Sequence, residues 1–430
     1  MNRIVIVGNG FDLAHGYRTS YKDFIEWYWE QWKNRLLSSS ESFLVDGLCS
    51  FKLKTRISSF FDAFKFDSEL SNIIVTYNSM FTPRVKSMPM AFEFINTLQR
   101  AYNCVEVKIS PLLLEIQKRI ESNWVDIETL YYEILTSKIL INEYNRHPSV
   151  LNKDLDLLKI KLVEYLIAVT KSVRGIHKGV IQEKLFRSVE KNEIAINSRD
   201  SWGKLIDIRS NMRTEGWKKL LEKYYIDDSK FNIAIKNVQY QAQRLIDSKP
   251  IVPIIDDQDF LRPDKVVLLN FNYTSIADSY FPSSRYSDFI VNHIHGILDE
   301  PNGVIFGYGD EIDDNFEKLK CLNDNDYLQN MKTIKYLETP KYREILNILE
   351  EDDFQVYIMG HSCGNSDRTL LNTMFEHRNC VSIKPFYYID EKGRDNYIDI
   401  VQNISRCFTN MQLMRDRVVN KEYCERLVEE

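Results

Sequence analysis

The feature that most constrains the fold is the opening of the chain, a short apolar run that ends in closely spaced glycines. Ile4–Val7 is a continuous β-branched run, and it is followed by Gly8, Asn9 and Gly10. Such a run is typical of a strand that is buried on both faces of a sheet. Glycines directly after a strand let the backbone approach a phosphate, and the start of the next helix adds a favourable dipole. The opening therefore predicts the first strand of a parallel sheet, followed by a nucleotide-binding turn.

Further strands are predicted only late in the chain. Short apolar runs, each followed by polar residues or glycine, cover residues 265–269, 290–295, 304–306, 354–359 and 381–389. Strands of this kind build a parallel sheet whose ligands lie at the carboxyl ends of the strands. We therefore predict an α/β fold with a Rossmann-like, mostly parallel sheet formed by residues 1–40 and 250–430.

Between these parts, the apolar residues recur at helical spacing. Ile116, Ile120, Trp124 and Ile127 follow one another at steps of three or four, as on one face of an amphipathic helix. Glycines and strand patterns are scarce in this stretch. The sequence therefore predicts that a large all-helical insertion, residues 41–249, splits the nucleotide-binding domain. A capping pattern of Ser20 with Asp23 predicts the start of the first long helix.

Composition narrows the class of protein. The 430 residues carry a formal net charge of −6, with both signs spread along the chain, which disfavours a dedicated nucleic-acid-binding surface. No apolar run is long enough to span a bilayer, and the opening run is too short for a signal peptide. The seven cysteines are scattered and never form a Cys-x-x-Cys pair. We expect a cytoplasmic protein with reduced thiols and without structural zinc or membrane contact.

The first two strand-end motifs favour a nucleotide-binding site in a protein that is not a dehydrogenase. Leu13 occupies the third glycine position of the dinucleotide fingerprint, so a nicotinamide dehydrogenase is disfavoured. A plain tight turn is the alternative for Gly8 and Gly10. Asn270 and Asn272 follow the next strand, where an unpaired buried amide would cost about 1–3 kcal/mol. Functional use is favoured, with an Asx turn as the alternative for one of them.

The third motif holds two histidines. Alternation along a strand places His293 and His295 on the same face. No Asp or Glu lies within the motif, so a metal site is not expected. His295, before Gly296, is predicted as a base or a ribose contact, whereas His293 is predicted to cap the core.

The fourth motif, Gly360 to Gly364, matches the Gly-x-Ser-x-Gly elbow of hydrolases around Ser362. The downstream histidine is His377, and Asp367 lies only five residues after the serine, which leaves no room for a strand to carry a triad acid. An esterase is disfavoured. A turn that contacts phosphate or ribose, with Asp367 near a helix start, is predicted instead.

These motifs together resemble a known family. The string from Arg3 to Gly16 and the segment 19–21 resemble the opening of the AbiH family of bacterial abortive-infection proteins. The resemblance continues, in the same order, through residues 124–128, 270–274, 294–296, 306–307, 360–362 and 367. It implies an anti-phage effector that is toxic when triggered, with a phage protein as the trigger and with assembly into a homo-oligomer left open.

The motif order is also distantly similar to that of sirtuin-like domains that hydrolyse NAD in other anti-phage systems. This similarity implies that Asn272 and His295 are catalytic, with Asp12 supplying a carboxylate because Asn270 and Thr274 replace the expected Thr and Asp. The residues that it implies as contacts of the dinucleotide are Gly8, Asn9, Gly10, Phe11, Gly16, Asn270, Tyr273, Gly296, Gly360, His361, Ser362 and Asp367.

Three hypotheses follow for the function. The leading hypothesis is a glycohydrolase that cleaves nicotinamide from NAD when infection triggers it. The second is a nucleotide-sensing or partner-binding module without catalysis. The third, an effector that acts on a nucleic acid, finds little support in charge or motif. The roles of Trp124, Asp126 and Glu128 stay open between a contact with the site and a pairing with a buried Arg.

Overall fold

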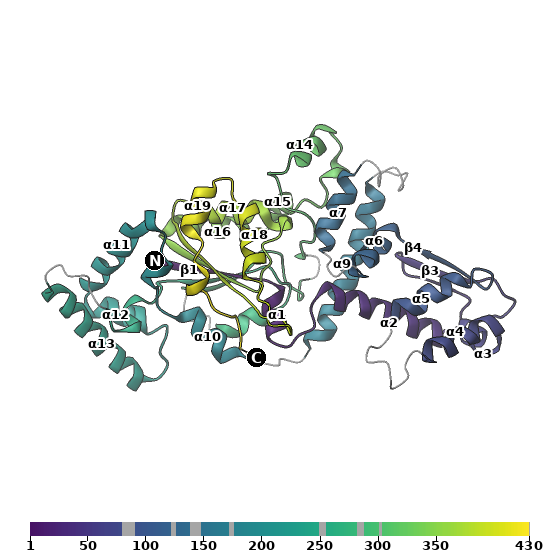
Figure 1. The fold of residues 1–430 in the computed structure, drawn as a ribbon, viewed down its shortest axis with the longest axis horizontal. Coiled ribbons are helices and arrows are strands. Elements are labelled where there is room, and N and C mark those ends of the chain that lie inside the picture. Colours follow the sequence, from purple (N-terminus) through teal and green to yellow (C-terminus); the bar gives the residue numbers. More distant parts are fainter. Residues whose placement is uncertain are drawn as a thin grey trace.

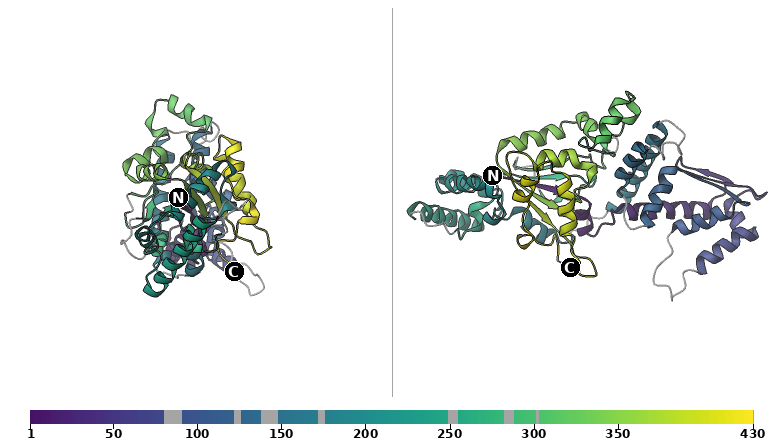
Figure 2. Two further views of the ribbon diagram at one scale, coloured as in Figure 1. Left: turned by 90° about the vertical axis from the view of Figure 1, so that its left-hand side faces the viewer. Right: turned by 45° about the horizontal axis from the view of Figure 1, so that its top comes forward.

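The computed structural model describes residues 1–79, 91–121, 126–137, 148–171, 176–248, 255–281, 288–300 and 303–429. A parallel sheet lies at the centre of the molecule, and two lobes extend from it at opposite ends (Figure 1). The two lobes also lie at opposite ends of the sheet in the right-hand view of Figure 2.

The central sheet joins the start of the chain to its last third. Its five strands run in the order β6-β5-β1-β7-β8, and all neighbours are parallel. The strands are β1 (Asn2–Val7), β5 (Val266–Asn270), β6 (Phe289–His293), β7 (Phe354–Met359) and β8 (Cys380–Phe386). The prediction that the first strand and the late strands share one parallel sheet is confirmed. The chain order reverses between β1 and β7.

Both faces of this sheet are covered, which explains the unbroken apolar run of β1. On one face, Ile4 and Ile6 share a hydrophobic core with α16 (Lys341–Glu351), α17 (Arg368–Phe375), α18 (Tyr397–Arg406) and α19 (Met411–Arg417). On the other face, Val5 and Val7 pack with α10 (Lys178–Phe186). Short helices complete this domain: α1 (Asn9–Ala14), α14 (Asp314–Cys321) and α15 (Lys332–Lys335).

Two predicted strands need correction. Residues 304–306 are not a strand but an extended segment outside the sheet, whose Ile305 N–H donates to the carbonyl of His295 at 2.9 Å. Three apolar residues in a row therefore marked burial and not strand pairing. The last strand ends at Phe386, three residues earlier than predicted, although Tyr387 still donates to the carbonyl of Glu425.

The prediction that residues 41–249 are all helical is wrong. Its first part contains a three-stranded antiparallel sheet of β2 (Phe43–Val45), β3 (Cys49–Leu53) and β4 (Val105–Ile109). In β3, Cys49, Phe51 and Leu53 are buried, while Lys52 between them is exposed. This alternation spans only five residues, so the surrounding helical periodicity hid it.

We call the part around this small sheet the mixed lobe. Its helices share one core that includes Trp29, Phe51 and Leu158. They are α2 (Tyr21–Ser38), α3 (Phe60–Phe66), α4 (Ser68–Ser79), α5 (Ala91–Arg100), α6 (Pro111–Glu121), α7 (Ile127–Thr136) and α9 (Ser149–Thr170). The predicted cap of α2 is confirmed, because the Ser20 hydroxyl accepts from the N–H of Asp23 at 3.1 Å.

The helical lobe is a separate unit at the opposite end. It consists of α11 (Arg199–Ser210), α12 (Thr214–Leu221) and α13 (Asp228–Asp247). Its core around Trp217 also takes in Met1 and Val381 from the amino ends of two sheet strands. The carboxyl edge of the sheet, by contrast, faces the mixed lobe (Figure 1).

The sequence also led to predictions about the cysteines and about membrane-spanning segments. All seven cysteines are free thiols. Among the helices within the described ranges, none has both the length and the apolar character needed to cross a membrane.

Arg3 of β1 connects the sheet to the segment around Leu185 and Arg187, which precedes the helical lobe. The side chain is fully buried, and its guanidinium donates to the carbonyls of Leu185 at 3.0 Å and Arg187 at 2.6 Å. It also donates to the side-chain oxygen of Gln355 at 2.9 Å and lies 4.2 Å from the ring centre of Tyr357.

We expect Arg3→Ala to lower the melting temperature by several degrees, because each buried acceptor left unpaired costs about 1–3 kcal/mol. Arg3→Lys keeps the charge but not the planar fork, so it should fall between Arg3→Ala and the wild type. Differential scanning calorimetry measures the effect, with Arg244→Ala on the exposed pair with Asp256 as the control. A melting temperature of Arg3→Ala equal to that of the control would contradict this role.

Candidate functional site

The segments that follow β1, β5, β6 and β7 meet at the carboxyl edge of the sheet. Phe271 after β5 donates its N–H to the carbonyl of Val7 at 2.9 Å. Its ring centre lies 5.0 Å from that of His295 after β6, and 4.4 Å from that of His361 after β7. The four segments singled out in the sequence therefore form one region, at the place where the strand order reverses.

Glycines let the turns after β1 and β7 touch. A Cβ on Gly8 would lie 2.5 Å from Cα of His361, and a Cβ on Gly360 would lie 2.0 Å from the backbone nitrogen of Phe11. Gly360 also has φ of +74°, a conformation that favours glycine. Gly8 and Gly360 are thus required by the close approach of two protein backbones.

The same contact occupies the N–H groups of the turn. The N–H of Gly10 donates to the carbonyl of Gly360 at 2.8 Å, and that of Phe11 donates to the carbonyl of Gly8 at 2.9 Å. Gly8 itself donates to Met359 at 3.2 Å. Two of the N–H groups in the predicted phosphate-binding turn, those of Gly8 and Gly10, are therefore used inside the protein, as is that of Phe11.

Asp12 anchors one polar network of the region. It is 2% exposed and accepts from the amide nitrogen of Asn272 at 2.8 Å and from the hydroxyl of Thr274 at 2.7 Å. Burial raises the pKa of Asp12 to about 7, although both hydrogen bonds act in the opposite direction. Asp12 thus changes its charge near neutral pH.

The two asparagines have different roles. The Asn270 side chain accepts from the N–H of Asn272 at 3.0 Å and donates to the carbonyl of Thr274 at 3.0 Å. It therefore holds the loop, as the Asx-turn alternative predicted for one of the pair. The half-buried Asn272 instead reaches out of its loop, to Asp12 and to the carbonyl of Gly8 at 2.9 Å.

A second network of charged side chains is almost fully buried. Lys332, with no exposed surface, lies 2.9 Å from a carboxylate oxygen of Glu128 and 2.8 Å from one of Asp367. Nε2 of His295 lies 3.3 Å from Asp367, and Nε2 of His361 lies 3.4 Å from its other oxygen. We call these five residues the buried ion cluster.

Burial and mutual pairing set the charges in this cluster. Burial would raise the pKa of Asp367, but Lys332 and His295 hold it well below its usual range. Burial raises the pKa of Glu128 to about 8 against the pull of Lys332. Burial also lowers the pKa of His295 to about 4, and Lys332 adds to this shift. Lys332 therefore balances Asp367, while burial favours the uncharged forms of Glu128 and His295.

The prediction that His293 and His295 share a strand face is wrong, because β6 ends at His293. The chain then turns through Gly296, which has φ of +87°. His293 lies 3.1 Å from the carboxylate of Asp278. His295 instead lies 3.1 Å from the hydroxyl of Tyr336, inside the buried ion cluster.

The remaining predicted contacts lie around these networks. Tyr273 is buried, with its hydroxyl donating to the carbonyl of Ile305 at 3.1 Å. Asn9 is exposed and accepts from Thr19, and Gly16 has a positive φ just after α1. Ser362 is exposed, and its carbonyl accepts from the side chain of Asn403 at 2.8 Å.

The signature in the mixed lobe divides into two roles. Asp126 caps α7 by accepting from the N–H groups of Glu128 at 3.0 Å and Thr129 at 3.2 Å. Glu128 crosses from the mixed lobe into the site, where it also accepts from the N–H of Gly307 at 3.0 Å. Its partner is Lys332 and not an Arg. Trp124 lies outside the described residues.

Sequence reasoning missed Lys332. It lies in a stretch without a strand pattern or glycine motif, and lysines are almost always exposed. Only the pairing with two distant carboxylates identifies it. Within the described ranges, no group of three or more His, Cys, Asp or Glu side chains is arranged to hold a metal ion.

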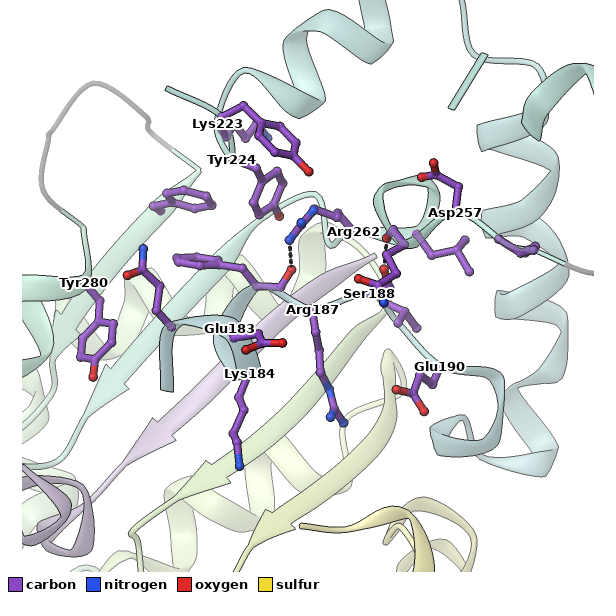
Figure 3. Close-up of a pocket in the computed structure, with 18 of the residues that line it drawn as sticks. Glu183, Lys184, Arg187, Ser188, Glu190, Lys223, Tyr224, Asp257, Arg262 and Tyr280 are labelled. Atoms are coloured by element: carbon purple, nitrogen blue, oxygen red, sulfur yellow. Dashed lines mark hydrogen bonds between the residues drawn. The ribbon is translucent and has the colours of Figure 1, made fainter. Parts of the chain in front are cut away.

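Two cavities lie near or beside this region. The smaller one, of about 290 Å³, lies at the carboxyl edge and is lined by the loops after β1, β5 and β6 together with the end of α9 and the start of α10. The larger one, of about 1670 Å³, lies between α10 and the helical lobe (Figure 3). There, Arg187 pairs with Glu193 at 2.5 Å, and Arg262 pairs with Asp259 at 2.6 Å. These two arginines are therefore already paired with carboxylates. No residue of either polar network lines the larger cavity.

Comparison with known proteins gives one result. The family model described as bacteriophage abortive infection AbiH matches residues 4–388, a range that includes most of β1, the other four strands of the central sheet and both polar networks. No curated protein matches the chain, and no solved structure matches it.

The raised pKa of Asp12 predicts a pH-dependent stability. Below about pH 4 the carboxyl group is protonated in both the folded and the unfolded chain, so its raised pKa does not lower the free energy of unfolding. Between about pH 4 and pH 7 only the unfolded chain ionises, and stability is lost as the pH rises, by a few kcal/mol in all. Asp12→Asn lacks this penalty.

We therefore expect the melting temperature of Asp12→Asn, relative to the wild type, to rise from pH 4 to pH 7 and then to level off. Thermal melts in a series of buffers measure the difference. Asp207→Asn, which alters an exposed carboxylate, is the control. If the curves of Asp12→Asn and the wild type run parallel over this range, Asp12 does not titrate as described.

Proposed function

The chain belongs to the AbiH family of bacteriophage abortive infection, and on that premise we propose that it is a defence effector that hydrolyses NAD when infection opens its site. The bond cleaved is the N-glycosidic bond between ribose and nicotinamide. The observation that carries the proposal is the pairing of Asp12 with Asn272 beside the buried ion cluster, at the carboxyl edge of a parallel sheet.

The strand order supports a nucleotide as the ligand. Numbered along the chain, the five strands run 3-2-1-4-5. This is the order of the first five strands in doubly wound, Rossmann-like dinucleotide-binding sheets. In such sheets the ligand lies outside the carboxyl ends, next to the point where the order reverses, which here is between β1 and β7. Both polar networks contain residues from the segments that leave this edge: Asp12, Asn272 and Thr274 in one, and His295, His361 and Asp367 in the other.

The chemistry of the site suits cleavage of an N-glycosidic bond. As that bond breaks, its electron pair leaves with nicotinamide, and the ribose gains positive charge that a carboxylate stabilises. The oxygen of a water molecule then bonds to the ribose, and a base takes the proton. Asp12, with a pKa of about 7, is matched to this task near neutral pH. Asn272 would orient the water, and the neutral His295 would accept a hydrogen bond from a ribose hydroxyl.

The burial of the ion cluster supports a closed resting state. His295 is 3% exposed and Lys332 is not exposed at all. An activity that depletes NAD must be silent before infection. Because Glu128 joins the cluster from the mixed lobe, a phage product that displaces this lobe would open the cluster. The mixed lobe is therefore the proposed sensing part.

This proposal is tested in infected cells that express the full chain. We expect growth arrest together with loss of NAD and release of nicotinamide in cells with the wild type. Asn272→Ala and His295→Ala should abolish both effects at equal protein levels. The matched control is His377→Ala, because this histidine pairs with Glu350 near the amino edge of the sheet. Mass spectrometry of cell extracts measures NAD, nicotinamide and ADP-ribose.

Arrest of infected cells with intact NAD would overturn the glycohydrolase and would favour an effector that acts on a nucleic acid. Protection without arrest, and with NAD intact, would instead favour a non-catalytic sensing module. Loss of NAD that persists in both alanine variants would place the catalytic centre elsewhere in the chain.

A further inference from the structure

The small cavity at the carboxyl edge contains an unbalanced positive charge. Lys171, just after α9, and Lys178, the first residue of α10, both line it, while Asp299 is its one acidic lining residue. Within the described part of the chain, neither lysine forms an ion pair. The side chains of Ser275 and Ser279 add two hydroxyl donors. Cations and hydroxyls around a cavity are the groups that bind phosphate oxygens.

One of the lysines is held at the cavity by an aromatic ring. The ammonium of Lys178 lies 5.7 Å from the ring centre of Tyr280. The Tyr280 hydroxyl lies 2.6 Å from Nε2 of His15, and Nδ1 of His15 lies 2.7 Å from the carbonyl of Phe11. His15 is itself part of the cavity wall. The ring that Lys178 contacts is therefore oriented by the chain that follows β1.

The cavity adjoins the Asp12 network. Ser275 directly follows Thr274, whose hydroxyl donates to Asp12. On the other side, Tyr17 lines the cavity and donates its N–H to the carbonyl of Asp12 at 3.2 Å. An anion bound in the cavity would lie next to the residues proposed for catalysis.

The size of the cavity limits what it can hold. Pockets for whole ligands measure about 300–1,000 Å³, and this cavity of about 290 Å³ lies at the lower end. It has room for a pyrophosphate with part of a ribose, but not for a complete dinucleotide. The N–H groups of Gly8, Gly10 and Phe11 are already bonded within the protein. The cavity instead offers side-chain cations and hydroxyls as phosphate contacts.

We propose that this cavity binds the pyrophosphate group of the ligand, with Lys171 and Lys178 as the counter-charges and Ser275 and Ser279 as hydroxyl donors. The assignment of a pyrophosphate-bearing ligand follows from the cavity itself, whereas its identity as NAD rests on the proposed function.

The test uses the purified full chain and two probes, inorganic pyrophosphate and ADP-ribose, titrated by calorimetry. We expect both to bind the wild type, and we expect Lys171→Gln with Lys178→Gln to weaken both by about tenfold or more, because two charge-assisted contacts are lost. The control removes the same charge from the exposed surface of the helical lobe by Lys218→Gln with Lys236→Gln. It should bind as the wild type does. Thermal melts check that both double variants are folded.

The phosphate site would be overturned if the wild type bound neither probe. It would also be overturned if the variant with both lysines replaced bound the probes as tightly as the wild type does. The two proposals fail separately. Binding that depends on the two lysines, in a protein that leaves NAD intact in infected cells, would retain the phosphate site and reject the glycohydrolase. Loss of NAD that is undiminished in cells with Lys171→Gln and Lys178→Gln would retain the glycohydrolase and reject this phosphate site.

Discussion

β1 forms parallel ladders with β5 on one side and with β7 on the other, although these strands begin only at Val266 and Phe354. The loops that leave the three strands must therefore end at one edge, because parallel strands point the same way. The mixed lobe and the helical lobe both lie between β1 and β5 in the sequence, and the chain comes back beside β1 after them. Glycines then allow the loops after β1 and β7 to touch. The meeting of Asn272, His295 and His361 follows from the register of one central strand.

The buried ion cluster links the sheet domain to the mixed lobe, beside a hydrophobic core that also joins them. A charge is costly to bury unless it is paired and hydrogen-bonded, and here Lys332 is shared by Asp367 and Glu128. The raised pKa of Glu128 favours its uncharged form, which lowers the cost of burying it beside Asp367. Withdrawal of α7 would remove Glu128 from Lys332 and from the N–H of Gly307, which would then need water. The same contacts that close the site thus make its opening depend on the lobe.

Much of the fold follows from local patterns in the sequence. Apolar runs marked all five strands. Four of them are buried along their whole length, whereas the edge strand β6 is mostly half-buried. Ser20 with Asp23 marked the start of α2. The small sheet of the mixed lobe did not follow, since β3 alternates over only five residues among helices. At the site, the convergence of four motifs was predictable from parallel strands. Lys332 was not, because its burial depends on two carboxylates that lie far away in the sequence.

The glycines after β1 show why a motif alone does not determine a role. A glycine turn can approach a phosphate or another stretch of backbone, and in both cases the lack of a Cβ is what matters. Here the donors of Gly8 and Gly10 bond to Met359 and Gly360. One N–H group cannot serve both a carbonyl of the protein and a phosphate at full strength. Side chains can balance the charge of a nucleotide at this edge, and the two lysines that line the small cavity lie where the mixed lobe ends and α10 begins.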